Sequence, residues 1–281
     1  MTVSVHTHPA GYPIYSISAG DSKFELSAFG GQLLSWTKSG TPILFSNEVR
    51  AIQDGKTAYR GGAPICFPYF GKGVLLPSAP LAPQHGRART TVWESEVKES
   101  SIVLRTEQPS PDGFGPTLLS CELIYSFDED VTIEARISNR GEIESPFQLA
   151  VHSYWTCGDP SGATVQGLGA LFLDNLKGLE QGEDPASFAP HTPVFDRVYP
   201  DTVDDLEVLT ESFRLSISTQ NCSGGVLWNP GENHGLADLG SLDFICVENG
   251  VIASPRTLGA GEEFRFRIRY EAHLVGPAIP S

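Results

Sequence analysis

Short segments in which apolar and polar residues alternate recur along the chain and predict many β-strands. Val131, Ile133, Ala135 and Ile137 alternate with polar side chains, which is the two-residue period of a strand with one buried face. No stretch longer than about 12 residues keeps the 3.6-residue apolar period of an amphipathic helix. The strands predicted in this way are residues 12–18, 22–29, 90–99, 101–107, 121–127, 131–139, 213–220 and 263–275.

Glycine and proline separate these segments. The chain has 29 glycines and 21 prolines, and they mark turns at intervals of about 8 to 15 residues. Many short strands joined by turns are typical of an antiparallel sandwich or barrel. Because no linker, low-complexity tract or fixed-period repeat interrupts the pattern, we predict a single all-β domain over residues 1–281. The acidic, proline-containing stretch 180–195 is predicted to be a long surface loop.

The charge of the chain narrows the choice of partners. With 19 basic against 34 acidic residues the net charge is −15, so the mean field of the protein repels nucleic acids and anionic membranes. A small anionic ligand remains compatible, because it needs only a local cluster of arginines. Arg265, Arg267 and Arg269 alternate with apolar residues on the last predicted strand, and we interpret them as a solvent-exposed strand face.

The cysteines and the N-terminus point to the cytoplasm. Five cysteines lie far apart without a CxxC pair, unlike a disulfide framework or a structural zinc site, so we expect reduced thiols. The N-terminal residues lack the basic region followed by an apolar region that a signal peptide requires. No apolar run approaches the roughly 18 residues that cross a bilayer. We therefore expect a cytoplasmic protein without a membrane partner.

The segment "FQLAVHSYW", residues 147–155, places a histidine within a pattern typical of a buried strand. Alternation places His152 with Gln148 and Tyr154 on the side opposite most of the large apolar residues. A lone histidine on such a strand is usually a hydrogen-bonded core residue. The strand pattern alone therefore leaves open whether His152 lies in the core or lines a cleft.

Two further segments combine arginines with glycine or histidine. In "YRGGAPICFPYFG", Arg60 precedes two glycines and an aromatic run, so the backbone can approach a ligand while aromatic rings form a wall. An edge loop with a surface arginine is the alternative. In "PQHGRART", His85, Arg87 and Arg89 cluster before a predicted strand and form either a local anion site or an exposed turn.

A carboxylate ends the apolar run of "LDFICVENGV". Glu248 is followed by Asn-Gly, which predicts a turn. Because glutamate is seldom fully buried without a partner, Glu248 is either an exposed cap or a carboxylate held in a cleft. The chain contains no GxSxG, GxxxxGK[ST] or HExxH motif, so the common nucleophile, phosphate-loop and zinc-protease arrangements are not predicted.

Taken in chain order, these segments resemble the aldose 1-epimerase (mutarotase) superfamily, and in particular its glucose-6-phosphate 1-epimerase branch. The stretch 24–47 is also similar to the opening strands of that branch, and the resemblance runs from about residue 14 to 274. The segments that carry it are "YRGGAPICFPYFG", "PQHGRAR", "FQLAVHSYW", "VQGLGALFLDN", "FDRVY", "VLWNP" and "DFICVENG".

The resemblance implies a large antiparallel β-sandwich of the galactose mutarotase-like type, with a sugar cleft and no cofactor or metal. It implies that His152 is the general acid and Glu248 the general base. A further four positions are implied to bind the substrate: Arg60, His85 and Arg89, which line the sugar and its phosphate, and Asp174, which contacts the sugar.

The chain departs from the pattern of the branch at two places. Asn175 follows Asp174 where the branch usually has a lysine, and residues 232–234 read Glu-Asn-His where lysine is more usual. Fewer cations near the cleft weaken the assignment of a phosphate more than the assignment of an epimerase.

The function implied is the interconversion of the α and β anomers of a hexose 6-phosphate by a monomer. A base removes the proton of the C1 hydroxyl while an acid protonates the ring oxygen, and the opened ring recloses on the other face. The pKa of histidine, ordinarily near 6.5, suits the acid, and we expect Glu248 to favour the imidazolium form of His152. The alternatives are an epimerase acting on an unphosphorylated aldose such as galactose, or a carbohydrate-binding module without turnover.

Overall fold

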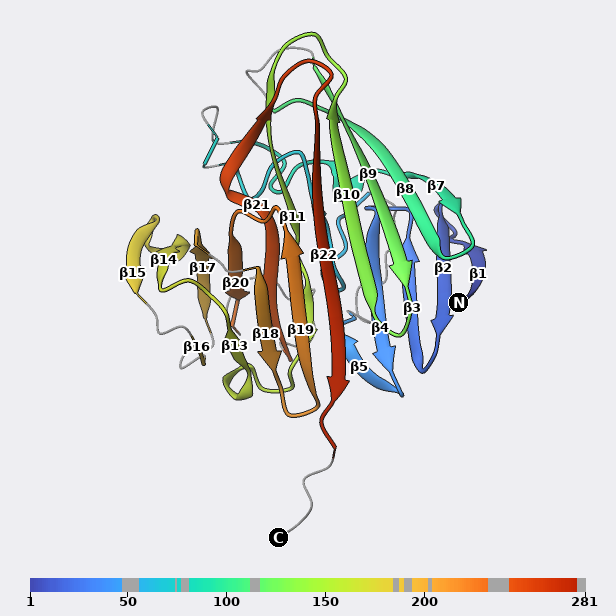
Figure 1. Cartoon of the computed structure of the whole chain (residues 1–281), viewed down its shortest axis with the longest axis vertical. Coiled ribbons are helices and arrows are strands. Elements are labelled where there is room, and N and C mark those ends of the chain that lie inside the picture. The colour runs from blue at the N-terminus through green and yellow to red at the C-terminus, as the bar shows by residue number, and fades with distance from the viewer. Residues whose placement is uncertain are drawn as a thin grey trace.

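The computed structural model describes residues 1–46, 56–73, 75–76, 81–111, 117–183, 187–189, 194–201, 204–231 and 243–276. Within these residues the chain is all-β, with two large antiparallel sheets and three short 3₁₀ helices (Figure 1). The helices are η2 (Ala88–Thr90), η3 (Pro160–Gly162) and η4 (Asn175–Lys177). None of the described elements is a helix long and apolar enough to cross a membrane. The predicted all-β sandwich is confirmed.

The first sheet carries the candidate site. In spatial order its strands are β1 (Thr2–Thr7), β2 (Pro13–Ala19), β3 (Ser22–Ser27), β4 (Gln32–Lys38), β5 (Thr41–Leu44), β12 (Tyr154–Thr156), β21 (Phe244–Leu258), β20 (Gly225–Asn229), β17 (Phe195–Tyr199), β14 (Leu171–Asp174) and β15 (Glu180–Glu183). Two strands lie off this path: β11 (Ser145–Val151), which pairs with β21, and β6 (Ile65–Cys66), which pairs with β11.

The second sheet covers one face of the first. Its order is β16 (Ser187–Phe188), β13 (Thr164–Gln166), β18 (Asp205–Leu209), β19 (Phe213–Gln220), β22 (Glu263–Leu274), β10 (Val131–Asn139), β9 (Leu118–Phe127), β8 (Ser101–Pro109) and β7 (Glu94–Val97). The predicted strands 131–139 and 213–220 agree with β10 and β19 at both ends. Alternation holds in β22, where Phe266, Ile268 and Tyr270 are buried in the core.

The arginines of β22 lie on the outer face of the second sheet, as predicted. Arg265 pairs with Glu263 at 2.8 Å, and Arg269 pairs with Asp128 at 3.2 Å. These ion pairs are largely exposed, so they contribute little to stability and mainly keep the face hydrated.

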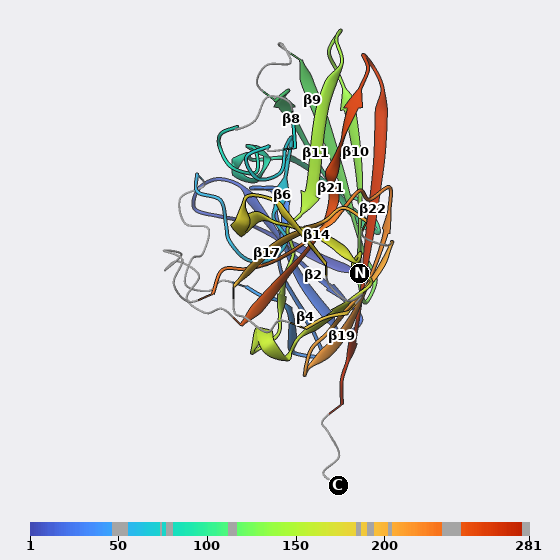
Figure 2. The same cartoon turned by 90° about the vertical axis from the view of Figure 1, so that its left-hand side faces the viewer.

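The central strands of the first sheet are covered on both faces, since all residues of β11 and the first nine of β21 are buried, whereas the edge strands β1 and β15 are largely exposed. Phe147, Leu149 and Val151 of β11 belong to the main core between the sheets. Ala150 instead joins a smaller apolar cluster that includes Cys66. Figure 2 shows residues 60–73 and 81–90 on the side of the first sheet away from β22.

Two sequence predictions are corrected by the described residues. The stretch 180–195 is not a simple loop, because it contains the short strands β15 and β16 and ends where β17 begins. Asn249 and Gly250 do not form a turn, because β21 continues through them between β11 and β20. A Cβ on Gly250 would lie 2.0 Å from the carbonyl oxygen of Leu149, so the close approach of β11 requires glycine.

Candidate active site

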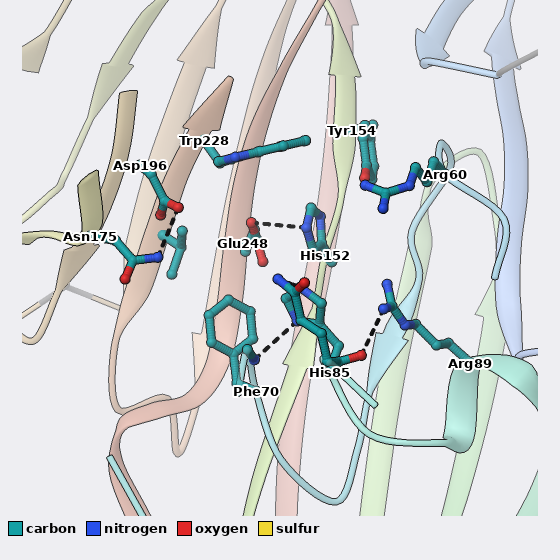
Figure 3. Close-up of a pocket in the computed structure, with 13 residues that line it drawn as sticks. Arg60, Phe70, His85, Arg89, His152, Tyr154, Asn175, Asp196, Trp228 and Glu248 are labelled. Atoms are coloured by element: carbon teal, nitrogen blue, oxygen red, sulfur yellow. Dashed lines mark hydrogen bonds and ion pairs between the residues drawn. The ribbon is translucent and has the colours of Figure 1, made fainter. Parts of the chain in front are cut away.

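His152 and Glu248 face each other where two strands meet the middle of β21. β11 ends at Val151, opposite Asn249, and β12 begins at Tyr154, opposite Cys246, so His152 lies in the break between β11 and β12. The backbone N–H of His152 donates to the carbonyl of Pro64 at 2.9 Å. The Nε2 atom of His152 lies 3.3 Å from Oε1 of Glu248 (Figure 3). The strand break therefore turns the histidine toward the central carboxylate.

Burial controls the protonation of this pair. The pKa of His152 is lowered to about 3, chiefly by burial and also by the nearby guanidinium groups of Arg89 and Arg60, which a backbone hydrogen bond partly opposes. Burial also raises the pKa of Glu248 well above its ordinary value, and the charge of Asp196 acts in the same direction. The expectation that His152 rests as an imidazolium is therefore wrong. The resting pair is neutral and shares one proton, because a poorly solvated site disfavours two separate charges.

Each member of the pair has hydrogen-bonding capacity left for a ligand. Among the described residues, no group is hydrogen-bonded to Nδ1 of His152 or to Oε2 of Glu248, although both atoms are buried. The imidazole stacks on Tyr154 at 4.9 Å between ring centroids and meets the edge of Trp228 at 5.7 Å. These rings fix the plane of the imidazole and give the pocket an aromatic wall suited to the apolar face of a sugar.

A second histidine, His85, is fixed as a neutral donor. Its backbone has a left-handed φ of 65°, and its Nδ1 accepts a hydrogen bond from the backbone N–H of Gly71 at 3.1 Å. The proton of the neutral ring therefore lies on Nε2. Burial lowers the pKa of His85 well below its ordinary value, and His152, Arg89 and Arg60 add to this effect. His85 can therefore donate one hydrogen bond from Nε2 without carrying a charge.

Two arginines line the pocket beside the histidines. Arg60 lies in the glycine-containing segment before β6, and Arg89 belongs to η2. The guanidinium of Arg89 donates to the carbonyl of Gln84 at 2.7 Å, which holds it toward the pocket. Both arginines are half-buried. The pocket thus brings together segments 59–71 and 83–90, which sequence analysis had considered separately.

Asp174 lies outside the lining of the pocket. Its carboxylate accepts from the backbone N–H of Leu176 at 3.0 Å, which caps η4, and it pairs with Lys177 at 3.2 Å. The neighbouring Asn175 lines the pocket instead and donates from Nδ2 to Asp196 at 2.9 Å. The substrate contact expected of Asp174 stays a prediction.

Sequence analysis missed Asp196 as a candidate site residue. Asp196 lies on β17 opposite Trp228 of β20, and both side chains line the pocket. The available signal was an acidic residue directly after Phe195 in "FDRVY", one of the segments that carry the family resemblance. Residues 232–234, where a lysine is more usual in the branch, lie outside the described residues. Among the described residues, no cluster of three or more His, Cys, Asp or Glu is arranged to hold a metal ion.

The overall architecture defines the class of the protein. The fold matches that of a provisionally assigned mutarotase from Salmonella typhimurium, with a TM-score of 0.79 and 22% identity over 97% of this chain and 94% of the other. It also matches a galactose 1-epimerase from Lactobacillus acidophilus, with a TM-score of 0.74 and 13% identity over 98% of this chain and 99% of the other. The chain therefore has the galactose mutarotase-like β-sandwich fold.

Sequence comparison assigns the family. The family model described as "Aldose 1-epimerase" matches residues 13–271, so the chain belongs to the aldose 1-epimerase family. A protein from Cenchrus ciliaris, provisionally named glucose-6-phosphate 1-epimerase, is 28% identical over 275 residues, which are 88% of this chain and 80% of that protein. A protein from Escherichia coli with the same provisional name is 28% identical over 234 residues, 78% of this chain and 76% of that protein.

Proposed function

We propose that the protein interconverts the α and β anomers of a hexose 6-phosphate, with glucose 6-phosphate as the first candidate. The observation that carries this proposal is the close pair of His152 Nε2 and Glu248 Oε1, 3.3 Å apart in a pocket that also presents Arg60 and Arg89. Membership of the aldose 1-epimerase family supports the reaction type. The provisional names of the relatives support the phosphorylated substrate.

The single proton of the buried pair is enough for the reaction. Transfer of that proton from Glu248 to His152 gives a carboxylate and an imidazolium, the reactive form of the pair. Glu248 then accepts the proton of the C1 hydroxyl while His152 protonates the ring oxygen, and the C1–O5 bond breaks to give the aldehyde. Rotation about C1–C2 and the reverse proton transfers close the ring as the other anomer. Each positioned proton transfer contributes roughly 10²–10⁴-fold.

The arginines supply the binding of the phosphate. Guanidinium groups form paired, charge-assisted hydrogen bonds with phosphate oxygens. Arg89 is oriented by the carbonyl of Gln84, so part of the cost of ordering its side chain is met before the substrate binds. A phosphate held at C6 places the ring oxygen and C1 at a fixed distance from the arginines, toward His152 and Glu248.

Two further properties belong to the same proposal. All five cysteines are free thiols, as in proteins of reducing compartments, so we place the protein in the cytoplasm. We further propose that the enzyme acts as a monomer, because every charged and aromatic group used in this mechanism belongs to one chain.

Substrate comparison tests the proposal. Saturation-transfer NMR between the two C1 protons measures anomer exchange for glucose 6-phosphate, glucose and galactose at equal concentration. We expect the catalysed exchange, above the uncatalysed rate, to be at least about 10-fold faster for glucose 6-phosphate, because only that substrate engages the arginines. Equal acceleration of phosphorylated and free sugars would remove the phosphate from the proposal.

A further inference from the structure

The charges that line the pocket are divided between two sides of the His152–Glu248 pair. The basic side carries Arg60 and Arg89, and the acidic side carries Asp196 (Figure 3). The electrostatic effects on the pair agree with this order. Both arginines lower the pKa of His152, whereas the pKa of Glu248 is raised by Asp196 and lowered by Arg89. From one side of the pocket to the other, the side chains therefore follow in the order Arg60 and Arg89, His152, Glu248, Asp196.

The acidic side of the lining contains no cation among the described residues. Asp196 accepts its hydrogen bond from the uncharged amide of Asn175 at 2.9 Å. Lys177 is directed to Asp174, with its side chain 67% exposed. The guanidinium of Arg197 lies over the ring of Phe172 at 4.1 Å. Among the described residues that line the pocket, no basic side chain pairs with Asp196.

The acidic side of the pocket, around Asp196, favours a ligand that carries a positive charge. Burial and the nearby charge of Asp174 raise the pKa of Asp196 above its ordinary value, although the hydrogen bond from Asn175 opposes this effect. Burial and Asp196 together raise the pKa of Glu248. A positive group placed beside Asp196 would relieve both carboxyl groups, because an opposite charge favours the ionised form. The ionised form of Glu248 is also the one that acts as the base.

The order of groups around a pyranose matches the order across the pocket. Starting from a phosphate on C6, the ring continues through C5 and the ring oxygen to C1 and then C2. If the phosphate binds Arg60 and Arg89, the ring oxygen lies near His152 and the C1 hydroxyl lies near Glu248. The substituent on C2 is the next group along the ring, and it reaches Asp196.

We propose that this pocket is specific for a 2-amino-2-deoxyhexose 6-phosphate, whose ammonium group at C2 binds Asp196 while its phosphate binds the arginines. The inference rests on the proposed function and specifies its substrate. Asn175 acts as the specificity-determining residue, because its amide orients the carboxylate of Asp196 without neutralising it. An ammonium group at C2 adds the attraction of an opposite charge to the hydrogen bond that a C2 hydroxyl would donate to the same carboxylate.

The test compares anomer exchange in three substrates by saturation-transfer NMR at the C1 protons. For the unaltered protein, we expect kcat/KM for glucosamine 6-phosphate to exceed that for glucose 6-phosphate about 10-fold, with 2-deoxyglucose 6-phosphate lowest of the three. Asn175→Lys places a cation beside Asp196 and should bring the preference for the amino sugar to about one or below. Asp196→Asn should remove the preference by removing the charge.

A matched control separates this local effect from a general change in charge. Leu176→Lys adds the same charge one position further along, on a side chain that is 58% exposed and does not line the pocket. This variant should keep the 10-fold preference. Urea denaturation of Asn175→Lys, compared with the unaltered protein, shows whether the variant is folded.

The outcomes distinguish this inference from the proposed function. Rates for the amino sugar within two-fold of those for glucose 6-phosphate, or below them, would overturn the inference and leave the proposed function standing. An equal loss of preference in Leu176→Lys and Asn175→Lys would overturn the role of Asn175. If neither sugar phosphate exchanges faster than in buffer, the proposed function fails and the inference fails with it.

Discussion

His152, the proposed general acid, is a buried side chain whose burial disfavours the charged form. The sequence suggested His152 through its position in "FQLAVHSYW" and suggested Glu248 as a carboxylate at the end of an apolar run. The structure places them 3.3 Å apart. Their protonation could not be predicted from the sequence, because it depends on burial and on Arg60 and Arg89, which are distant along the chain. The local sequence pattern predicts which side of a strand a side chain occupies, whereas its pKa depends on neighbours that only the tertiary structure brings together.

The pair of His152 and Glu248, with one transferable proton between them, predicts how kcat depends on pH. The lowered pKa of His152, about 3, means that a second proton enters the pair only at low pH. The raised pKa of Glu248 means that the only proton leaves well above the ordinary range of glutamate. We therefore expect kcat at saturating glucose 6-phosphate to change less than about two-fold across the ordinary titration range of histidine, within about one pH unit of 6.5. A loss of activity with a midpoint near pH 6.5 would indicate a histidine that titrates alone.

Gln148 shows the limit of strand alternation at the residue scale. It was predicted on the same side as His152, but it is buried and does not line the pocket. Its side chain accepts from the backbone N–H of Phe70 at 3.2 Å and donates to the carbonyl of Ile252 at 2.7 Å. Gln148 thus links the segment that contains Phe70 to β21. The sequence could not show this, because the covering segment comes from about 80 residues earlier.

At the scale of elements, β21 organises the site. This strand of 15 residues pairs with β20 on one side and with β11 and β12 on the other. The Asn-Gly pair was expected to turn the chain, and a local turn preference was overridden by these neighbouring strands. Gly250 is retained for close packing rather than for a turn, since its conformation does not require a positive φ.

The packing of Gly250 predicts the effect of a single methyl group. Gly250→Ala places a Cβ 2.0 Å from the carbonyl oxygen of Leu149, so β11 and β21 must separate. Forced overpacking of this kind costs about 1–3 kcal/mol, and we expect a loss of that size in the free energy of unfolding. Urea denaturation measures it. Gly162→Ala is the control, because a Cβ there meets nothing within 4 Å, and it should change stability by less than about 0.5 kcal/mol.

At the scale of the whole molecule, the sandwich brings distant segments to one pocket. Strand content and the all-β class followed from alternation and from the spacing of glycine and proline. The order of strands did not, because β5, β12 and β21 are neighbours in the first sheet although they are far apart in the chain. Asp196 was missed for the same reason: its position opposite Trp228 exists only after β17 and β20 have paired.

The molecule also shows how an acidic protein can gather positive charge in one pocket. The net charge of −15 is spread over the chain, whereas two arginines are concentrated in one half-buried pocket. A poorly solvated site would strengthen the interaction of these arginines with the proposed phosphate, relative to the screened charges of the surface. The exclusion of nucleic acid and membranes remains a prediction from the charge balance.

Exchange catalysed by Glu248→Gln tests the central claim most directly. The substitution keeps the shape of the side chain but removes the base, so anomer exchange of glucose 6-phosphate should fall at least about 100-fold. Binding of the sugar phosphate, measured by calorimetry, should stay within a few-fold, because the arginines are unchanged. If saturation-transfer NMR shows exchange at the rate of the unaltered protein, Glu248 is not the base and the proposed acid–base mechanism is wrong.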